Sequence, residues 1–335
     1  MDKDLKKLLK DGAKNPNAYR KGVYNKKRFY IGIVVLIFIL IFGIIEILKV
    51  NGVISWGKLY EDGSAVNGAV SSNSDFSVHY INTGQSDCSI VKCDGKVMMI
   101  DTAAPDGMDA IRASLITLDI DKIDVMLITH QHDDHMGCAE EIIKSYPVET
   151  IIMPRLSEIN MVTTKAYENL LLAINDKGVK PVAAEPGYEF MLGSARVTVL
   201  APLKQDKNLN NMSAVTRITY GDTAFLFEGD AEKEVEKELL NSGVDLSADV
   251  IKLGHHGSKT SSTEKYLKAV SPSVGIVSCG KENSYGHPHG EVLERLDKLG
   301  IDVYITALQG SITAESDGKT VKIITEKNGE EKTYG

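Results

Sequence analysis

The sequence predicts an α/β protein made of two packed α/β layers, preceded by one membrane-spanning helix. Three observations support this prediction. Short apolar strands alternate with amphipathic helices from residue 76 to residue 326, strands come before helices in each half of that region, and residues 29–48 form an uninterrupted apolar segment. The strand, strand, helix order is typical of α/β layers. The 335 residues are enough for one large domain or two small ones.

Residues 1–28 form a basic leader. Its charge is +7, whereas the whole chain carries −8, so the remainder carries −15. Residues 29–48 contain Glu46 as their only charge, and at roughly 1.5 Å per residue they would extend about 30 Å, the thickness of a bilayer core. No small-residue cleavage pattern follows, which favours a retained anchor over a signal peptide. The basic flank predicts a single pass, with the leader in the cytoplasm and the rest of the chain outside the cell membrane.

Residues 49–75 are rich in Gly, Ser and Asn and are interpreted as a flexible linker. The packed domain is expected over residues 76–326 and a polar tail over residues 327–335. Asp94-Gly95 is a hairpin turn signal between the second and third strands. Strands are expected at 76–81, 88–93, 97–100, 125–129, 150–153, 196–200, 214–220, 224–228, 250–253, 274–278, 303–306 and 320–325. Helices are expected at 108–118, 139–145, 164–177, 231–242, 263–269 and 291–299.

Four metal-competent side chains occupy six positions directly after the apolar strand at 125–129. They are His130, His132, Asp134 and His135. Imidazole and carboxylate are the ligands that Zn²⁺ and similar divalent ions take where no thiolate is present. A solvated loop would explain a lone His but not this spacing. Structural zinc sites are closed by four ligands, usually with Cys, so the absence of a thiolate among these candidates favours a catalytic site.

The H-x-H-x-D-H segment resembles the defining motif of the metallo-β-lactamase superfamily. Further motifs follow in that family's order: strands ending in Asp101, in Asp230 and in His255-His256. The resemblance implies the αβ/βα four-layer sandwich. It also implies that Asp101 supports the metal-binding loop and that Asp230 bridges two ions.

A closer resemblance covers about residues 76–326. The segments at 78–87, 255–261 and 283–288 are similar to the external domain of ComEC-type competence proteins and their stand-alone relatives. A choline-phosphate esterase of the pneumococcal surface is similar as well. The multi-helix DNA channel of the competence proteins has no counterpart in this sequence.

The resemblance also implies how the ligands are divided. His130 and His132 would hold one ion. Asp134, His135 and one of His255 and His256 would hold the other, with Asp134 also orienting the attacking water. Two-metal members have a further His before the Gly-Asp motif, but residues 136–229 contain none, and Asn211 and Ser213 stand in that region. The prediction is one or two divalent ions, Zn²⁺ first and Mn²⁺ second, with a weakened first site.

Other polar residues are candidates for contacts with a substrate. His287 follows a strand and could donate a proton to a leaving group or bind a phosphoryl oxygen, although a loop-stabilising role is the alternative. Ser258 and Lys259 lie in a hydroxyl-rich loop that suits phosphate oxygens and equally an ordinary turn. Asn211 and Ser213 are further candidates. His79, inside a strand, is expected to be structural.

Two cysteines flank the expected site loops. Cys138 follows the His cluster, and Cys279 precedes the loop of His287. If both loops converge on the metal, the two thiols could lie close together. Free thiols are nevertheless expected, because a disulfide requires Cα atoms within roughly 7 Å.

The leading functional prediction is an extracytoplasmic metal-dependent phosphodiesterase. Its substrate would be nucleic acid or a phosphorylated cell-envelope ester. The charge of −15 after the leader argues against a broad nucleic-acid surface, which needs several Lys or Arg on one face. The alternatives are a β-lactam or lactone hydrolase and a metal-binding accessory protein of the envelope without catalysis.

Overall fold

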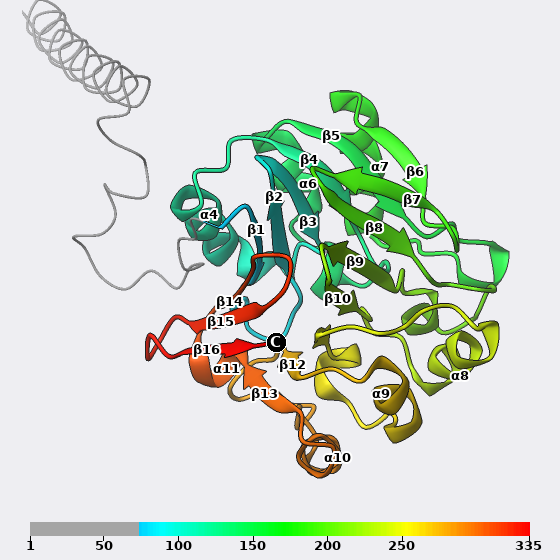
Figure 1. Ribbon diagram of the computed structural model, residues 1–335. Coiled ribbons are helices and arrows are strands. Elements are labelled where there is room, and N and C mark those ends of the chain that lie inside the picture. The colour runs from blue at the N-terminus through cyan, green and yellow to red at the C-terminus, as the bar shows by residue number, and fades with distance from the viewer. Residues whose placement is uncertain (1–73) are drawn as a thin grey trace, which may run out of the picture. The chain divides into compact units, whose positions relative to one another are not determined.

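The structure is a computed structural model that describes residues 74–335 (Figure 1). The predicted leader, the predicted membrane-spanning helix and most of the predicted linker fall in residues 1–73 and so lie outside the described residues. Within residues 74–335, none of the helices combines the length and the apolar character needed to cross a membrane.

Two sheets organise residues 74–335. The first contains β1 (Phe76–Tyr80), β2 (Ser89–Cys93), β3 (Lys96–Ile100), β4 (Ile123–Leu127), β5 (Val148–Met153), β6 (Lys180–Ala183), β14 (Ile312–Ser316), β15 (Val321–Thr325) and β16 (Glu331–Tyr334). The second contains β7 (Glu189–Leu192), β8 (Ala195–Val199), β9 (Thr216–Tyr220), β10 (Thr223–Phe227), β11 (Val250–Lys252), β12 (Val274–Val277) and β13 (Asp302–Ile305). Their orders are β16-β15-β14-β1-β2-β3-β4-β5-β6 and β13-β12-β11-β10-β9-β8-β7.

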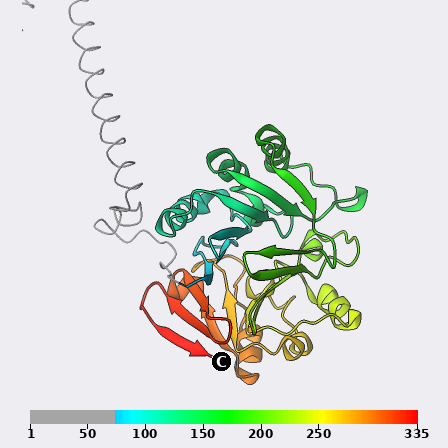
Figure 2. The same ribbon diagram turned by 45° about the horizontal axis from the view of Figure 1, so that its top comes forward.

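The helices lie on the outer sides of both sheets (Figures 1 and 2). The helices that connect strands of the first sheet are α4 (Met108–Thr117), α5 (Asp133–Met136), α6 (Ala139–Ser145) and α7 (Lys165–Lys177). The second is accompanied by α8 (Lys233–Ser242), α9 (Glu264–Val270), α10 (Gly290–Lys298) and α11 (Thr306–Gln309).

Alternating side chains divide the interior into three cores. In β10, Phe225 and Phe227 pack between the sheets, whereas Leu226 packs outward beneath α8 and α9. In β3, Met98 packs between the sheets, and its neighbour Met99 packs toward α4 and α6. A strand with apolar residues at every position can bury both faces. Three cores imply four layers, and the predicted αβ/βα sandwich is confirmed.

Parallel strands direct several loops to one edge of each sheet. β3, β4, β5 and β6 are parallel neighbours in the first sheet, and β10, β11, β12 and β13 are parallel neighbours in the second. Chemistry in open α/β sheets gathers at the carboxyl ends of such strands. The residues predicted to bind metal follow β4, β10 and β11, and Asp101, predicted to support the metal-binding loop, follows β3.

Several elements differ from the prediction. Residues 331–334 of the expected polar tail form β16, which pairs with β15, and the Tyr334 hydroxyl donates to Asp302 Oδ2 at 2.6 Å. β6, β7 and β14 were not predicted; β6 and β7 have four residues each, and β14 ends in the polar pair Glu315-Ser316. The fourth strand ends at Leu127 rather than at residue 129, which frees Thr129 to bond with Asp101.

The four cysteines of the sequence are free and buried. Cys138 belongs to the core beneath α4 and α6, whereas Cys279 belongs to the core beneath α9 and α10. The two thiols pack in different cores and form no disulfide, so the predicted free thiols are confirmed. His79 is fully buried, and its ring nitrogens lie 2.9 Å from Ser77 Oγ and 3.0 Å from Thr313 Oγ1, which is the arrangement of a structural histidine.

Candidate metal centre

The loop after β4 carries the His cluster and is held by Asp101. Asp101 Oδ1 accepts a hydrogen bond from the Thr129 backbone N–H at 2.7 Å, and Oδ2 accepts from the Thr129 hydroxyl at 2.8 Å. Oδ2 also lies 2.8 Å from His135 Nδ1. A carboxylate accepts and cannot donate, so the proton of His135 sits on Nδ1 and the lone pair on Nε2 faces away from Asp101.

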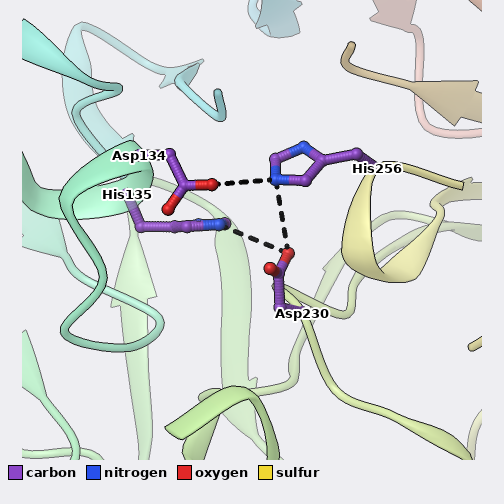
Figure 3. A group of neighbouring side chains, drawn as sticks. All are labelled: Asp134, His135, Asp230 and His256. Atoms are coloured by element: carbon purple, nitrogen blue, oxygen red, sulfur yellow. Dashed lines mark ion pairs between the residues drawn. The ribbon is translucent and has the colours of Figure 1, made fainter. Parts of the chain in front are cut away.

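Four side chains from three segments of the chain converge on the side of His135 that faces away from Asp101 (Figure 3). One ligand atom from each of Asp134, His135, Asp230 and His256 lies within 4.8 Å of the others. His135 Nε2 lies 3.3 Å from Asp230 Oδ1, and His256 Nε2 lies 3.4 Å from Asp134 Oδ2 and 3.7 Å from Asp230 Oδ1. Asp134 and His135 come from α5, Asp230 follows β10, and His256 follows β11.

The atoms at the centre of this cluster are buried and have no hydrogen-bond partner. They are Nε2 of His135, Oδ1 of Asp230 and Nε2 of His256. Leaving a buried polar atom without a hydrogen bond costs about 1–3 kcal/mol, and one cation bound among these three atoms would give all of them a partner. Two imidazoles and carboxylates are the donors of catalytic zinc sites. The cluster is therefore suited to a divalent metal ion.

Electrostatics favour a positive charge at the same place. Burial lowers the pKa of His256, but the carboxylates of Asp230 and Asp87 outweigh burial and raise it to about 10. Burial likewise opposes the charge on His135, yet Asp230 and Asp101 hold its pKa well above the usual range. Burial raises the pKa of Asp230, but His135 and His256 bring it well below the usual range. The excess of negative charge suits a cation.

His256 is oriented from behind by groups that the sequence did not reveal. Its Nδ1 lies 3.0 Å from the Ser278 carbonyl oxygen and 3.3 Å from Asp87 Oδ1. Both are acceptors, so the proton sits on Nδ1 and Nε2 faces the cluster. The other oxygen of Asp87 lies 2.8 Å from Lys252 Nζ. The one available signal was Lys252 itself, a charged residue within an otherwise apolar strand.

His255 and His256 both adopt left-handed backbone angles, with φ of 51° and 54°. Non-glycine residues in this region cost roughly 1 kcal/mol or more each, and such strain gathers at functional sites. Gly257 follows with φ of 79°, and a Cβ there would lie 2.7 Å from Pro288 Cβ. The strained turn packs directly on the loop that carries His287.

A second group of imidazoles faces the other oxygen of Asp230. His255 Nε2 lies 3.7 Å from Asp230 Oδ2, and His130 Nε2 lies 3.9 Å from it. His130 Nε2 also lies 2.9 Å from His132 Nδ1. Asp230 thus has His135 and His256 beside one oxygen and His130 and His255 beside the other.

The cluster opens into a cleft of about 610 Å³. His287 lies on its wall. The exposed Tyr285 ring stacks on the His287 ring, with centroids 5.5 Å apart, and the His255 ring is 5.7 Å from it. Burial first, and then the nearby His256 and His255, lower the pKa of His287 to about 4. The described residues that line the cleft include no Lys or Arg. The lining residues are Gln85, Gln131, His132, Asp133, Asp134, Met161, Val162, Thr163, Thr164, Leu209, Asn210, Asp230, His255, His256, Tyr285 and His287.

The four residues suggested for substrate contact do not line this cleft. Ser213 is fully buried, accepts from the Asp230 N–H at 3.0 Å and lies 3.4 Å from His130 Nδ1. Asn211 accepts from the Glu232 N–H at 3.2 Å. Ser258 is buried and Lys259 is exposed. Asn210, one position before Asn211, lines the cleft, with Nδ2 3.5 Å from His255 Nε2.

Comparisons with known proteins point to the same fold. The family model described as the Metallo-beta-lactamase superfamily matches residues 81–199. ComE operon protein 3 of Bacillus subtilis (strain 168) is 34% identical over 194 residues, which cover 58% of this chain and 24% of that protein. Recombination protein 2 of Haemophilus influenzae is 29% identical over 239 residues, which cover 70% and 28%. The chain thus spans about a quarter of the length of these relatives. CmlA, a diiron beta-hydroxylase from Streptomyces venezuelae, shares the fold, with a TM-score of 0.52 at 15% identity over 73% of this chain and 55% of that one.

Proposed function

Because the chain carries a domain of the metallo-beta-lactamase superfamily with ComEC-type relatives, we propose that it is a metal-dependent hydrolase that cleaves phosphodiesters. The observation that carries this proposal is the convergence of three buried atoms that make no hydrogen bond, on His135, Asp230 and His256, beside an open cleft that Asp230 and His256 line. A structural metal site would be closed by protein ligands, whereas this one faces a space large enough for a substrate.

In this proposal His135, His256 and Asp134 would hold one ion, and Asp230 would be a ligand beside them. His130 and His132 belong to the second position, where His255 lies close to the same oxygen of Asp230. A bound divalent ion supplies a water of lowered pKa and a positive charge for developing negative charge on the substrate. Asp134 is the only one of the clustered carboxylates that is partly exposed, which suits it to orient a water molecule.

The remaining work falls to groups on the cleft wall. His287 offers a ring nitrogen toward the cleft and supplies an N–H group to a substrate oxygen. Asp101 and Asp87 keep the protons of His135 and His256 on Nδ1, so that Nε2 of each stays free to act as a ligand. Because the described residues that line the cleft include no Lys or Arg, the charge of a phosphodiester would be met by the metal ions and by N–H donors. This favours a short or locally bound ester over a long nucleic acid held along its backbone.

The test is hydrolysis by the full-length chain supplied with Zn²⁺ or Mn²⁺. We expect turnover of bis-p-nitrophenyl phosphate and none of nitrocefin. Single-stranded DNA and a choline-phosphate ester are tested beside them, as representatives of the two candidate classes of natural substrate. Asp134→Asn should abolish turnover. Asp133→Asn is the matched control, because its carboxylate is exposed, lines the same cleft and stands outside the cluster.

Hydrolysis of nitrocefin without hydrolysis of any phosphodiester would replace the proposal with the β-lactam or lactone alternative. Tight metal binding with no turnover of any substrate would favour the accessory protein without catalysis. We further propose that the domain lies outside the cell membrane, anchored by residues 29–48, since the apolar segment follows a basic leader.

A further inference from the structure

Gln85 lies beside the loop that joins β12 to α10 and contacts that loop at two points. Its side-chain Oε1 accepts a hydrogen bond from the Gly280 backbone N–H at 3.0 Å. Its Nε2 lies 3.3 Å from Nδ1 of His287. The absence of a side chain at Gly280 makes this close approach easier. A Cβ on Gly280 would lie 3.2 Å from the backbone nitrogen of Gln85 and 3.4 Å from the Gln85 Cβ.

The Gly280 contact decides which end of the Gln85 amide faces His287. A backbone N–H only donates, so the atom that meets it must be the amide oxygen. If the amide were turned over, its NH₂ group would face the Gly280 N–H, donor against donor. The oxygen therefore points to Gly280, and the NH₂ group points to His287.

The amide in turn decides which ring nitrogen of His287 carries the proton. An NH₂ group donates and cannot accept, so Nδ1 of His287 must be the acceptor. From this geometry we propose that Gln85 is a positioning residue that places the His287 proton on Nε2. No hydrogen bond within the described part of the chain engages Nε2, and His287 lines the cleft, so this N–H is available to a ligand.

The backbone of His287 is fixed independently of the ring. Asn283 Oδ1 accepts from the His287 N–H at 2.9 Å, and Asn283 Nδ2 donates to the carbonyl oxygens of His287 at 2.7 Å and Gly280 at 2.8 Å. Asn283 thus sets where the ring stands, and Gln85 sets which of its nitrogens donates. Such a preorganised donor stabilises charge that develops on a substrate oxygen. That use of the N–H rests on the proposed phosphodiesterase function, whereas the placement of the proton does not.

The experiment reads the tautomer directly. The full-length chain is labelled with ¹⁵N in its histidine rings and loaded with diamagnetic Zn²⁺, and multiple-bond ¹H–¹⁵N correlation spectra are recorded. The signal absent from a His287→Gln variant belongs to His287. We expect Nε2 of His287 to resonate as a protonated nitrogen and Nδ1 as an unprotonated one.

Gln85→Glu is the decisive variant. A carboxylate still accepts from Gly280 but can only accept from His287, so the Nδ1 resonance should move into the protonated range. Gln85→Met removes the polar end of the side chain, so the Nδ1 resonance of His287 should shift because Nδ1 no longer accepts a hydrogen bond from residue 85. This variant keeps the inference testable if Gln85→Glu does not fold. Thr163→Glu is the matched control, since it adds a charge from an exposed position on the same cleft and should leave the His287 pattern unchanged.

A wild-type protein whose His287 proton is on Nδ1 would overturn the inference. So would a His287 pattern that is the same in wild type, Gln85→Glu and Gln85→Met, because Gln85 would then only support the loop. Failure of the proposed function looks different: the expected resonances would be seen in a protein that hydrolyses no phosphodiester.

Discussion

Oδ1 of Asp87 lies 3.3 Å from Nδ1 of His256, and this contact places a buried carboxylate directly behind a residue of the metal cluster. The charge of Asp87 is balanced by Lys252, whose Nζ lies 2.8 Å from its other oxygen. Burial alone would raise the pKa of Asp87, but Lys252 and His256 lower it below its usual range. The carboxylate is thus ionised because the ammonium is beside it, and the two must be considered together.

We predict that Lys252→Met destabilises the protein strongly. The substitution leaves Asp87 as an unpaired buried charge, and breaking a buried pair in this way costs about 3–5 kcal/mol of unfolding free energy. Lys259→Met, at an exposed lysine seven positions later, should change stability by no more than about 0.5 kcal/mol. Urea unfolding of the metal-free proteins followed by circular dichroism measures both. Adding Asp87→Asn to Lys252→Met should recover part of the loss, and equal stability of wild type and Lys252→Met would contradict this account.

The second prediction concerns the number of ions. Asp134, His135, Asp230 and His256 form a compact group of four potential ligands. On the other side of Asp230, the sequence has no His between residues 136 and 229 to complete a site with His130 and His132. After dialysis, elemental analysis should find nearer one ion than two per chain.

A pair of variants separates the two positions. His256→Ala should lose the retained ion, whereas His132→Ala should keep it. A firm content of two ions in the wild type would show that His255, or water, completes the position beside His130. Retention of the ion by His256→Ala would show that the tightly held ion lies elsewhere.

How far the sequence predicted this site depends on how far apart its parts lie along the chain. Asp134 and His135 belong to one six-residue motif, and Asp230 and His256 each end a strand, so pattern and family resemblance could find them. Asp87 and Lys252 are 165 positions apart and meet only because their loops and strands end at the same edge. Nothing in either local sequence indicates that contact.

Side-chain direction within loops was the other limit. Asn211 and Ser213 stand in a region that reaches the site, but Ser213 supports Asp230 from behind and the neighbouring Asn210 faces the cleft instead. The direction of a loop side chain depends on backbone angles that composition does not report. The same applies to β16, whose polar sequence forms a strand because β15 offers an edge for pairing.

The third prediction concerns topology, which depends on residues 1–73. Protease added to intact cells should remove the domain of residues 76–326 and spare the leader, because the basic leader and the apolar segment predict an N-inside single pass. In permeabilised cells the leader should be digested as well, which provides the control. A domain that resists protease in intact cells but not in permeabilised ones would place it on the cytoplasmic side.

The fourth prediction uses His79, which lies far from the metal cluster in sequence and is fully buried in β1. Burial first, and Lys92 second, lower its pKa from 6.5 to about 3. Between these two pH values the unfolded chain binds a proton at His79 that the folded protein does not, so stability falls as the pH falls. At pH 5 the loss from this one group should be about 2 kcal/mol relative to pH 7.5.

His79→Gln isolates this effect, since glutamine can still bond with Ser77 and Thr313 but does not titrate. Its cost in unfolding free energy, measured against wild type in metal-free protein, should be largest at pH 7.5 and should shrink by about 2 kcal/mol at pH 5. Protonation of the metal-cluster residues affects both proteins equally and cancels in the difference. A cost that is the same at both pH values would mean that His79 takes up its proton in the folded protein as readily as in the unfolded chain. The Ser77 and Thr313 hydroxyls would then accept hydrogen bonds from both N–H groups of a charged ring, instead of contacting a neutral ring.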